Sequence, residues 1–213
     1  MEELNEEKET IKDETKIRIL IVGNSRVGKT CLISRYINNI FKEKYISTIG
    51  LDFETKYLNK NNKKYEIELI ETKLENNLKI KYEGIIFVYD TTDQQSFDDI
   101  SNYIEFIQEK KGKKFNMILL GNKIDEEEGK KVFKETGEKL AEEKEVKFYE
   151  VSCKDGTNVN EAINALIDLI LETRSERKAE IVNENIGNDQ KLIENKNEQK
   201  KDKTGCCPCC PCC

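Results

Sequence analysis

The chain has 213 residues, enough for one domain of ordinary size with tails, and hydrophobic and charged residues each make up 37% of it. The formal net charge of -6 argues against a nucleic-acid-binding protein, because phosphate contacts need clustered Lys and Arg. The chain contains no histidine, which excludes imidazole bases, His metal ligands and Ser-His-Asp triads.

Neither a membrane-spanning helix nor a targeting peptide is expected from the sequence. No apolar run reaches the length of about 18 residues that a span requires. Residues 1–15 are rich in Glu and Lys with almost no apolar content, which predicts a solvated acidic extension rather than a signal or transit peptide. Six of the eight cysteines lie in the last eight residues, which excludes a folded core held together by disulfides.

Apolar runs and periodicities predict strands that alternate with helices. Strands are expected at residues 17–22, 51–58, 64–70, 85–89, 116–120 and 146–151, with a hairpin turn at 59–63. Helices are expected at 31–39, 96–110, 132–143 and 159–171. Because the strands are continuously apolar, this order predicts an α/β fold with a mostly parallel six-stranded sheet, one antiparallel edge strand and helices on both faces. Ligands of such sheets bind at the carboxyl ends of the strands.

A glycine-rich loop follows the first expected strand. The run GNSRVGKT, residues 23–30, satisfies the P-loop pattern and lies between a buried strand and a helix. Its glycines let the backbone curl so that N–H groups point at phosphates, helped by the helix N-terminus. Lys29 is expected to neutralise the β- and γ-phosphates, and the Thr30 hydroxyl is expected to bind Mg²⁺. The fold expected is therefore the three-layer P-loop NTPase fold, and this loop alone does not choose between ATP and GTP.

The run GNKID, residues 121–125, follows another buried strand and selects the base. The Asp125 carboxylate can accept hydrogen bonds from N1–H and the 2-amino group of guanine, while the Lys123 stem can lie along the base. Adenine has neither donor at those positions, so a buried acceptor would be left unpaired, which discriminates strongly. GTP or GDP is therefore expected, and a P-loop kinase that uses ATP conflicts with this motif.

The motifs GNSRVGKT, YISTIGLDFE, GIIFVYDTTDQQSF, GNKID and VSCKDG, in this order, resemble Rab-type small GTPases of the Ras-like superfamily over residues 16–174. The resemblance implies that Thr48 contacts Mg²⁺ and the γ-phosphate and that Phe41 stacks on the base. It also implies that residues 152–154 form the loop that lies behind the base. The nucleotide-binding residues that it implies are Gly23, Asn24, Ser25, Arg26, Val27, Gly28, Lys29, Thr30, Cys31, Phe41, Tyr45, Thr48, Asn122, Lys123, Asp125, Ser152, Cys153 and Lys154.

The same resemblance implies a monomeric GTPase, with Lys29 and Thr48 in catalysis, that acts as a membrane-anchored switch in vesicle traffic. It implies effector proteins, an exchange factor, an activating protein, a dissociation inhibitor and a prenylation escort as partners. It also implies a location on the cytoplasmic face of intracellular membranes, with a soluble cytosolic pool.

The second switch departs from the family pattern. Rab relatives carry Asp-Thr-Ala-Gly-Gln where this chain has Glu-Thr-Lys-Leu-Glu at residues 71–75, and the following segment is several residues shorter. Glu71 takes the place of the Asp that holds Mg²⁺ through water, Leu74 that of a glycine, and Glu75 that of the glutamine that orients the attacking water. We expect nucleotide binding with poor hydrolysis; compensation by another residue and a pseudo-GTPase scaffold are the alternatives. Arg26, where relatives usually have a small residue, is expected to speed nucleotide exchange.

Residues 175–205 are polar and predict a flexible linker, and residues 206–213 form the cysteine-rich end CCPCCPCC. This end resembles the doubly prenylated tail of Rab proteins, with Cys212 and Cys213 as the lipidated residues, and two lipid chains give stable anchoring. A C-a-a-X box and a metal-binding cluster fit less well, and palmitate on the other four cysteines stays open. Three lysines, Lys200, Lys201 and Lys203, would add attraction to anionic lipids.

Overall fold

The computed structural model describes residues 15–41, 52–71 and 81–201, and the side chains of Asp52 and of residues 181–201 lie outside that description. The chain divides into two compact units, residues 1–170 and residues 171–213, and each is considered by itself. The acidic extension expected at 1–15 (apart from Thr15) and the cysteine-rich end at 206–213 lie outside the described residues.

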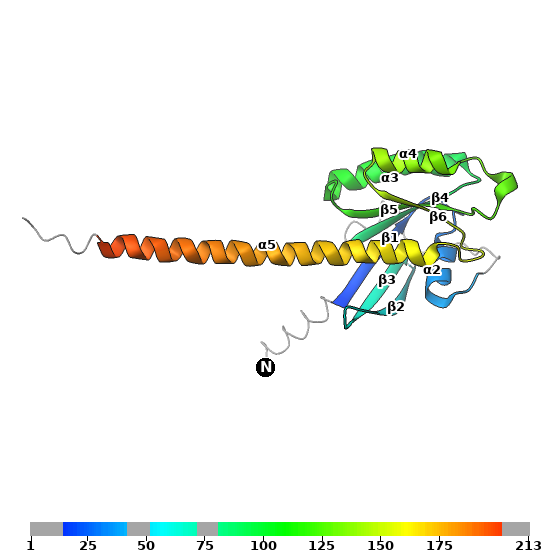
Figure 1. The fold of residues 1–213 in the computed structure, drawn as a ribbon. Helices are drawn as coiled ribbons and strands as arrows, with labels where there is room; N and C mark the ends of the chain where they lie inside the picture. The colour runs from blue at the N-terminus through cyan, green and yellow to red at the C-terminus, as the bar shows by residue number, and fades with distance from the viewer. Residues whose placement is uncertain (1–14, 42–51, 72–80, 202–213) are drawn as a thin grey trace, which may run out of the picture. The chain divides into compact units, whose positions relative to one another are not determined.

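Strands and helices alternate as the apolar pattern predicts (Figure 1). The strands are β1 (Lys16–Val22), β2 (Asp52–Lys60), β3 (Lys63–Glu71), β4 (Gly84–Asp90), β5 (Asn116–Asn122) and β6 (Lys147–Val151). The helices are α2 (Lys29–Asn38), α3 (Gln94–Lys111), α4 (Lys134–Glu143) and α5 (Val159–Lys201), with the short 3-10 helix η2 (Glu127–Gly129) after β5. Except at the end of α5, the bounds differ from the predicted ones by two residues or fewer.

The six strands form one sheet in the order β2-β3-β1-β4-β5-β6. Strands β2 and β3 are antiparallel, and every other neighbouring pair is parallel. The predicted fold class, a mostly parallel six-stranded sheet with one antiparallel edge strand, is therefore confirmed. The parallel register brings the last residues of β4 and β5 together, because Asp90 is paired with Asn122. The loops after β1, β4, β5 and β6 consequently start at the same edge.

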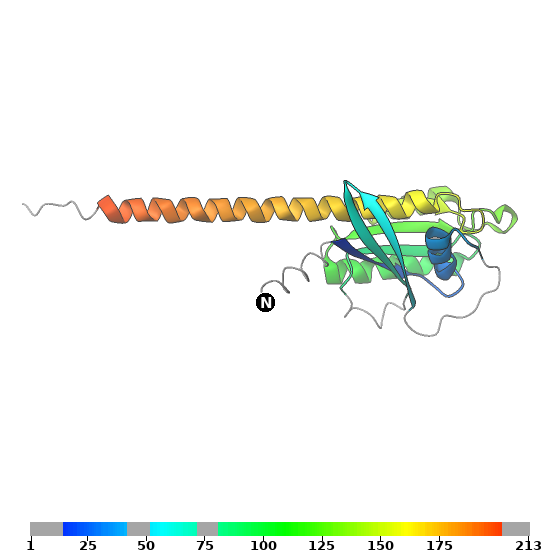
Figure 2. The ribbon, with the colours of Figure 1, turned by 90° about the horizontal axis from the view of Figure 1, so that it is seen from below.

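Helices cover both faces of the sheet. Helices α3 and α4 lie together on one face, joined by a hydrogen bond from Gln108 to the Lys144 carbonyl oxygen (2.9 Å). Helix α2 and the first turns of α5 lie on the other face (Figures 1 and 2), where the Tyr36 hydroxyl donates to Asn164 at 3.1 Å. Each central strand is therefore buried on both sides, which is why its sequence is apolar without alternation.

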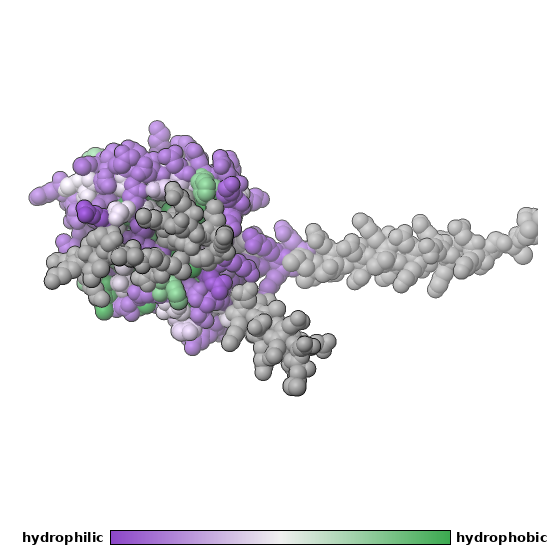
Figure 3. All heavy atoms as spheres, turned by 180° about the vertical axis from the view of Figure 1, so that it is seen from behind, coloured by the Kyte–Doolittle hydropathy of each residue, from purple (hydrophilic) through white to green (hydrophobic). Residues whose placement is uncertain are grey.

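Two buried cores lie on either side of the sheet. Beneath α3 and α4 the buried side chains include Leu20, Val22, Phe87, Leu119, Ile100 and Ile104. Other side chains with no more than 3% exposure come from β1, β3, α2 and α5, and include Ile19, Ile67, Leu32, Ile33, Ile163 and Leu166. On the visible face of Figure 3 the described surface is mainly hydrophilic, with hydrophobic residues in separate spots.

Helix α5 corrects one prediction. Residues 175–205 were expected to form a flexible linker, but α5 continues through residues 175–201. Among its residues up to 180, whose burial is described, the last buried one is Ile170, so burial does not sustain the helix over residues 171–180. The continuation contains good helix formers, five Glu and five Lys, together with five Asn and Gly187, which are poor ones, and it contains no proline. Polarity indicated that the segment is solvated, but did not exclude a helix. Among the described helices, none is long and apolar enough to cross a bilayer.

Candidate functional site

A cavity of about 290 Å³ lies at the carboxyl edge of the sheet. It is bounded by the loop between β1 and α2, the end of β3, and the loops that follow β5 and β6. The residues that line it are Arg26, Gly28, Lys29, Thr30, Cys31, Phe41, Glu71, Asn122, Lys123, Asp125, Glu126, Cys153 and Lys154. Residues of the P-loop (23–30) and of the run GNKID (121–125, the guanine motif) therefore line one cavity, although the two motifs lie about a hundred residues apart in the chain.

The P-loop backbone needs glycine at two positions. A Cβ at Gly23 would lie 2.1 Å from the Val88 carbonyl oxygen, because the loop passes directly over β4. Gly28 has φ +102°, in the left-handed region, and its Cβ would lie 2.2 Å from the Asn122 side-chain nitrogen. Helix α2 begins at the next residue, Lys29, so its free N–H groups open into the cavity. This is the arrangement that binds anions at helix N-termini.

Lys29 lines the cavity and is held by its own loop. Its ammonium donates to the carbonyl oxygens of Gly23 at 3.1 Å and Asn24 at 2.8 Å. It also lies 3.6 Å from a carboxylate oxygen of Glu71, at the end of β3. The Lys29 side chain is therefore a positioned positive charge in a partly buried site, as expected for a group that neutralises phosphate.

Thr30 and Glu71 form a pair of oxygen donors in the same cavity. The Thr30 hydroxyl donates to a Glu71 carboxylate oxygen at 2.5 Å, and Glu71 is 9% exposed. A hydroxyl and a carboxylate side by side fit Mg²⁺, which prefers hard oxygen ligands and keeps several waters. The extra methylene of Glu71, relative to Asp, does not prevent this approach.

The guanine motif is tied to the P-loop through Asn122. Its side-chain nitrogen donates to the Val27 carbonyl oxygen at 2.8 Å, and its side-chain oxygen accepts from the Cys153 N–H at 3.2 Å. Asn122 is 2% exposed, so both bonds are made in the protein interior. One side chain therefore fixes the phosphate loop, the end of β5 and the loop after β6 relative to one another.

Asp125 is held in place from the loop after β6. The Ser152 hydroxyl donates to one carboxylate oxygen at 2.7 Å, and the Lys154 ammonium lies 3.6 Å from the other. Arg35 of α2 fixes that loop in turn, because its guanidinium donates to the carbonyl oxygens of Cys153 (2.8 Å) and Lys154. The acceptor predicted to recognise the base is therefore held by two neighbours, a hydroxyl and an ammonium, and Arg35 fixes the loop that carries both of them.

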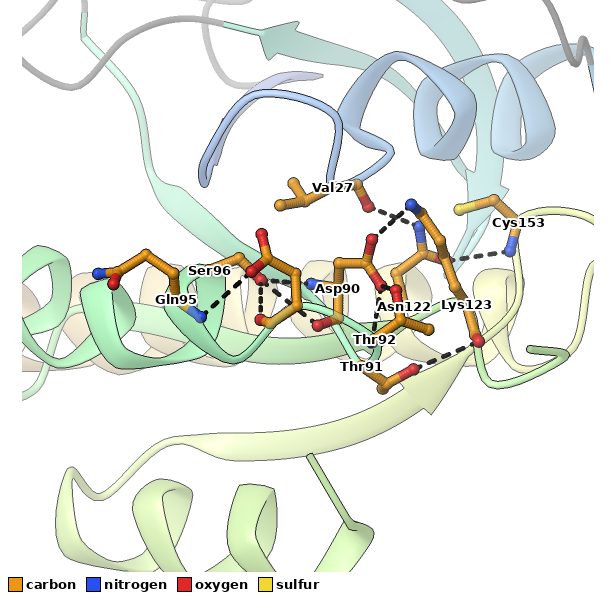
Figure 4. Close-up of polar contacts among 10 residues, drawn as sticks. Val27, Asp90, Thr91, Thr92, Gln95, Ser96, Asn122, Lys123 and Cys153 are labelled. Carbon is orange, nitrogen blue, oxygen red and sulfur yellow. Dashed lines mark hydrogen bonds and ion pairs between the residues drawn. The ribbon is translucent and has the colours of Figure 1, made fainter. Parts of the chain in front are cut away.

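The Lys123 side chain lies beside Asp90, the last residue of β4 (Figure 4). Its ammonium forms an ion pair with one Asp90 carboxylate oxygen, and its carbonyl oxygen accepts from the Thr91 hydroxyl at 3.3 Å. Sequence reasoning did not select Asp90, Thr91 or Arg35. A signal for Asp90 was present, since it is an acidic residue at the carboxyl end of a buried strand, where ligands bind.

The remaining predicted residues of the P-loop have different surroundings. Val27 is fully buried, whereas Ser25 and Arg26 are exposed. Arg26 has φ +69°, an uncommon value for a residue with a side chain. The Asn24 side chain does not turn to the cavity: it donates to Asp99 at 2.6 Å and accepts from the Tyr103 hydroxyl at 2.8 Å. Helix α3 therefore braces the P-loop from outside.

Three predicted residues, Tyr45, Thr48 and Glu75, lie outside the described residues, as do Cys212 and Cys213. Phe41 lines the cavity, and its stacking on the base stays a prediction.

The two cysteines of the site are free thiols. Burial raises the pKa of both the Cys31 and the Cys153 thiol. Both thiols are therefore protonated at neutral pH, which makes them poor nucleophiles and poor metal ligands. They contribute shape to the cavity rather than reactivity.

A phosphate-binding loop and a positioned base acceptor that line one cavity of a mostly parallel sheet define a P-loop nucleotide-binding protein. Its sequence fits the model of the Ras family over residues 18–172. It is 38% identical over 190 residues to the Ras-related protein Rab-13 of Canis lupus familiaris, with 86% of this chain and 94% of that protein covered. It is 34% identical over 189 residues to the Ras-related protein Rab-8B of Homo sapiens, with 85% and 91% covered. The chain therefore belongs to the Ras family, as a Rab-type small GTPase.

Proposed function

We propose that the protein is a Rab-like switch that binds GTP, GDP and Mg²⁺ and recruits effectors in vesicle traffic. The observation that carries the proposal is that Lys29, Thr30 and Asp125 line a single cavity. Phosphate, metal and base would then be held by groups from three different loops at the same sheet edge. The alternative ligand, ATP, is disfavoured because Asp125 offers only acceptors to the base edge.

Recognition of guanine rests on the Asp125 carboxylate. Ser152 and Lys154 hold this carboxylate, so it does not need to be reoriented when the base enters. A preorganised acceptor costs less free energy on binding than a mobile one. A base without N1–H and 2-amino donors would leave the carboxylate without partners, which lowers its affinity.

The phosphates would be held by the loop amides at the start of α2 and by the Lys29 ammonium. Bound Mg²⁺ would supply positive charge at the β- and γ-phosphates, and Thr30 and Glu71 would hold it, Glu71 through water. Thr48, which lies outside the described residues, is proposed as a further ligand by family resemblance.

Hydrolysis is proposed to be weak. In this family the glutamine of the second switch orients the attacking water, and here Glu75 takes its place in the sequence. A carboxylate only accepts hydrogen bonds and repels the phosphate charge. Catalysis of phosphoryl transfer depends on positioning and charge stabilisation, so this exchange would preserve binding and reduce turnover.

Family resemblance also supports the partners and the location. We propose effectors, an exchange factor, an activating protein, a dissociation inhibitor and a prenylation escort as partners. Lipid chains on Cys212 and Cys213 would anchor the monomer to the cytoplasmic face of intracellular membranes, with a soluble cytosolic pool. Mass spectrometry of the protein from a eukaryotic host tests this anchor, and an unmodified C-terminal peptide would contradict it.

The first experiment is to identify the nucleotide that the purified full-length protein retains with Mg²⁺ present. GDP or GTP is expected, and no measurable affinity for either would overturn the proposal. Asp125→Asn gives a sharper test, because an amide can donate to the 2-oxo group of xanthine where the carboxylate cannot. This variant is expected to prefer xanthosine diphosphate to GDP, and an unchanged preference for GDP would exclude Asp125 as the base acceptor.

The second candidate function is a pseudo-GTPase, a nucleotide-dependent scaffold without turnover, favoured by the Glu-Thr-Lys-Leu-Glu sequence at 71–75. Single-turnover cleavage of radiolabelled GTP separates the two candidates. The wild-type protein and Glu75→Gln are compared with an intact Ras-family GTPase. Cleavage by wild type at the rate of that reference would reject the pseudo-GTPase, whereas no detectable cleavage that Glu75→Gln restores would support it.

A further inference from the structure

Asp90 is a buried carboxylate that no part of the proposed mechanism uses. It ends β4, is 6% exposed, and is paired in the parallel register with Asn122 of the guanine motif. It does not line the nucleotide cavity itself. A buried charge is costly unless it is paired and hydrogen-bonded, so its partners indicate its role.

Both carboxylate oxygens of Asp90 have partners (Figure 4). One oxygen accepts from the backbone N–H of Thr92 at 2.8 Å and from the Thr92 hydroxyl at 2.7 Å. The other oxygen forms the ion pair with the Lys123 ammonium. Thr92 therefore orients the carboxylate, and the carboxylate in turn holds the lysine.

The backbone around Asp90 is also fixed. The Asp90 N–H donates to the Ser96 hydroxyl at 3.0 Å, and that hydroxyl donates to the Asp93 carbonyl oxygen at 2.7 Å. Ser96 is fully buried in the first turn of α3. The position of Asp90 is thus set by the pairing of β4 with β5 and by the start of α3.

Lys123 is held at both ends by the segment 90–92. Its backbone has φ +69°, an uncommon value for lysine, and the Thr91 hydroxyl donates to its carbonyl oxygen at 3.3 Å. The Thr91 N–H donates to the Asn122 carbonyl oxygen at 2.9 Å. With its backbone and its ammonium both fixed, the aliphatic stem between them is confined to the wall of the cavity that Lys123 lines.

We infer that Asp90 is a positioning residue for guanine nucleotide, which acts by holding Lys123 so that its stem forms a fixed wall for the base. The inference rests on the proposed function. Lysine has a flexible stem and loses much rotamer freedom when it is ordered. Asp90 imposes that order before the nucleotide binds, so the bound nucleotide is retained longer.

The test is the dissociation rate of a fluorescent GDP analogue from the full-length protein, chased with excess GDP in the presence of Mg²⁺. Asp90→Asn keeps the shape and the acceptor for Thr92 but removes the charge that faces Lys123. Loss of a charge-assisted contact to a partly exposed lysine is expected to speed dissociation about tenfold. Lys123→Met is expected to speed it at least as much.

A merely structural role is separated by a double-mutant cycle. In the Lys123→Met background, Asp90→Asn is expected to change the dissociation rate by less than about twofold, because its target is already absent. Effects that multiply in the double variant would overturn the inference, as would an Asp90→Asn rate equal to wild type. Loss of GDP binding by the wild-type protein would instead refute the proposed function, so the two failures are distinguishable.

Glu150→Gln is the matched control. Glu150 lies near the end of the neighbouring strand β6 and pairs with Lys130 at 2.7 Å, with side chains 15% and 19% exposed. Neither residue lines the nucleotide cavity, so the dissociation rate is expected to be unchanged. If Asp90→Asn does not fold, Thr92→Val carries the test: it keeps the ion pair but removes one contact that orients it. About threefold faster dissociation is then expected, and an unchanged rate would overturn the inference.

Discussion

Asn122 provides the most direct test of how the site is assembled, because one buried side chain joins its parts. In Asn122→Ala the Val27 carbonyl oxygen and the Cys153 N–H both lose their partner. Each unsatisfied buried group costs about 1–3 kcal/mol. Since Asn122 is 2% exposed, water cannot readily replace its amide, and the free energy of unfolding is expected to fall by roughly 2–6 kcal/mol.

The assay is urea denaturation followed by circular dichroism, in the absence and in the presence of saturating GDP. The stabilisation that GDP gives to the wild-type protein is expected to shrink in Asn122→Ala, because the phosphate loop and the base loop are no longer held together. Asn116→Ala is the matched control in the same strand: its side chain donates to the Glu83 carbonyl oxygen at 3.1 Å, far from the cavity. It is expected to cost about 1 kcal/mol and to leave the GDP effect intact.

The reasoning is refuted if Asn122→Ala lowers the free energy of unfolding by less than about 0.5 kcal/mol, since the two buried groups would then have found other partners. It is also refuted if GDP stabilises the variant as strongly as wild type. The second outcome would mean that the bridge supports the fold but not the ligand site.

Gly28→Ala is expected to lower the free energy of unfolding by about 2 kcal/mol and to abolish GDP binding in a fluorescence titration, because φ is +102° and the new Cβ would lie 2.2 Å from the Asn122 nitrogen. GDP binding as tight as wild type would show that the loop relaxes. Glu71→Ala removes the carboxylate 2.5 Å from the Thr30 hydroxyl, so a chelator is expected to speed GDP release much less than in wild type; an unchanged chelator effect would exclude Glu71 from the metal site. Burial raises the pKa of Cys31, so its thiol stays protonated at pH 7.5 and alkylation should accelerate only as the pH rises toward that raised pKa. Peptide mass spectrometry after iodoacetamide checks this, and alkylation of Cys31 as fast as that of an unfolded control at pH 7.5 would contradict it.

The amino-acid sequence alone determined the class of the fold and the chemistry of the site. Continuous apolar runs such as residues 85–89 indicate burial on both faces, and their alternation with helices favours a parallel sheet covered on both sides. The glycines and Lys29 of the P-loop, and Asp125 of the guanine motif, are local signals because a backbone shape or a donor pattern demands those residue types. Such motifs can be recognised without knowing which residues contact them in the folded protein.

Tertiary structure alone decided which distant residues became partners. The bond from Asn122 to Val27 spans 95 positions, and the pairs of Asp90 with Lys123 and of Arg35 with the loop after β6 depend on how strands and helices are placed side by side. Composition gives no account of these contacts, because Asp, Asn and Arg are equally acceptable on a solvated surface. The parallel register pairs Asp90 with Asn122, and this pairing brings Asp90 next to Lys123 in the site.

The length of α5 shows that hydrophobic periodicity did not predict where this helix ends. The apolar pattern at helical spacing ends at Leu171, next to Ile170, the last buried residue in the part of α5 whose burial is described, whereas the helix itself does not end there. The helix nevertheless continues to Lys201, through a segment that mixes good helix formers such as Glu and Lys with poor ones such as Asn and Gly187. Hydrophobic patterning therefore determined what is packed in this protein, while backbone continuity beyond the core was visible only in the structure.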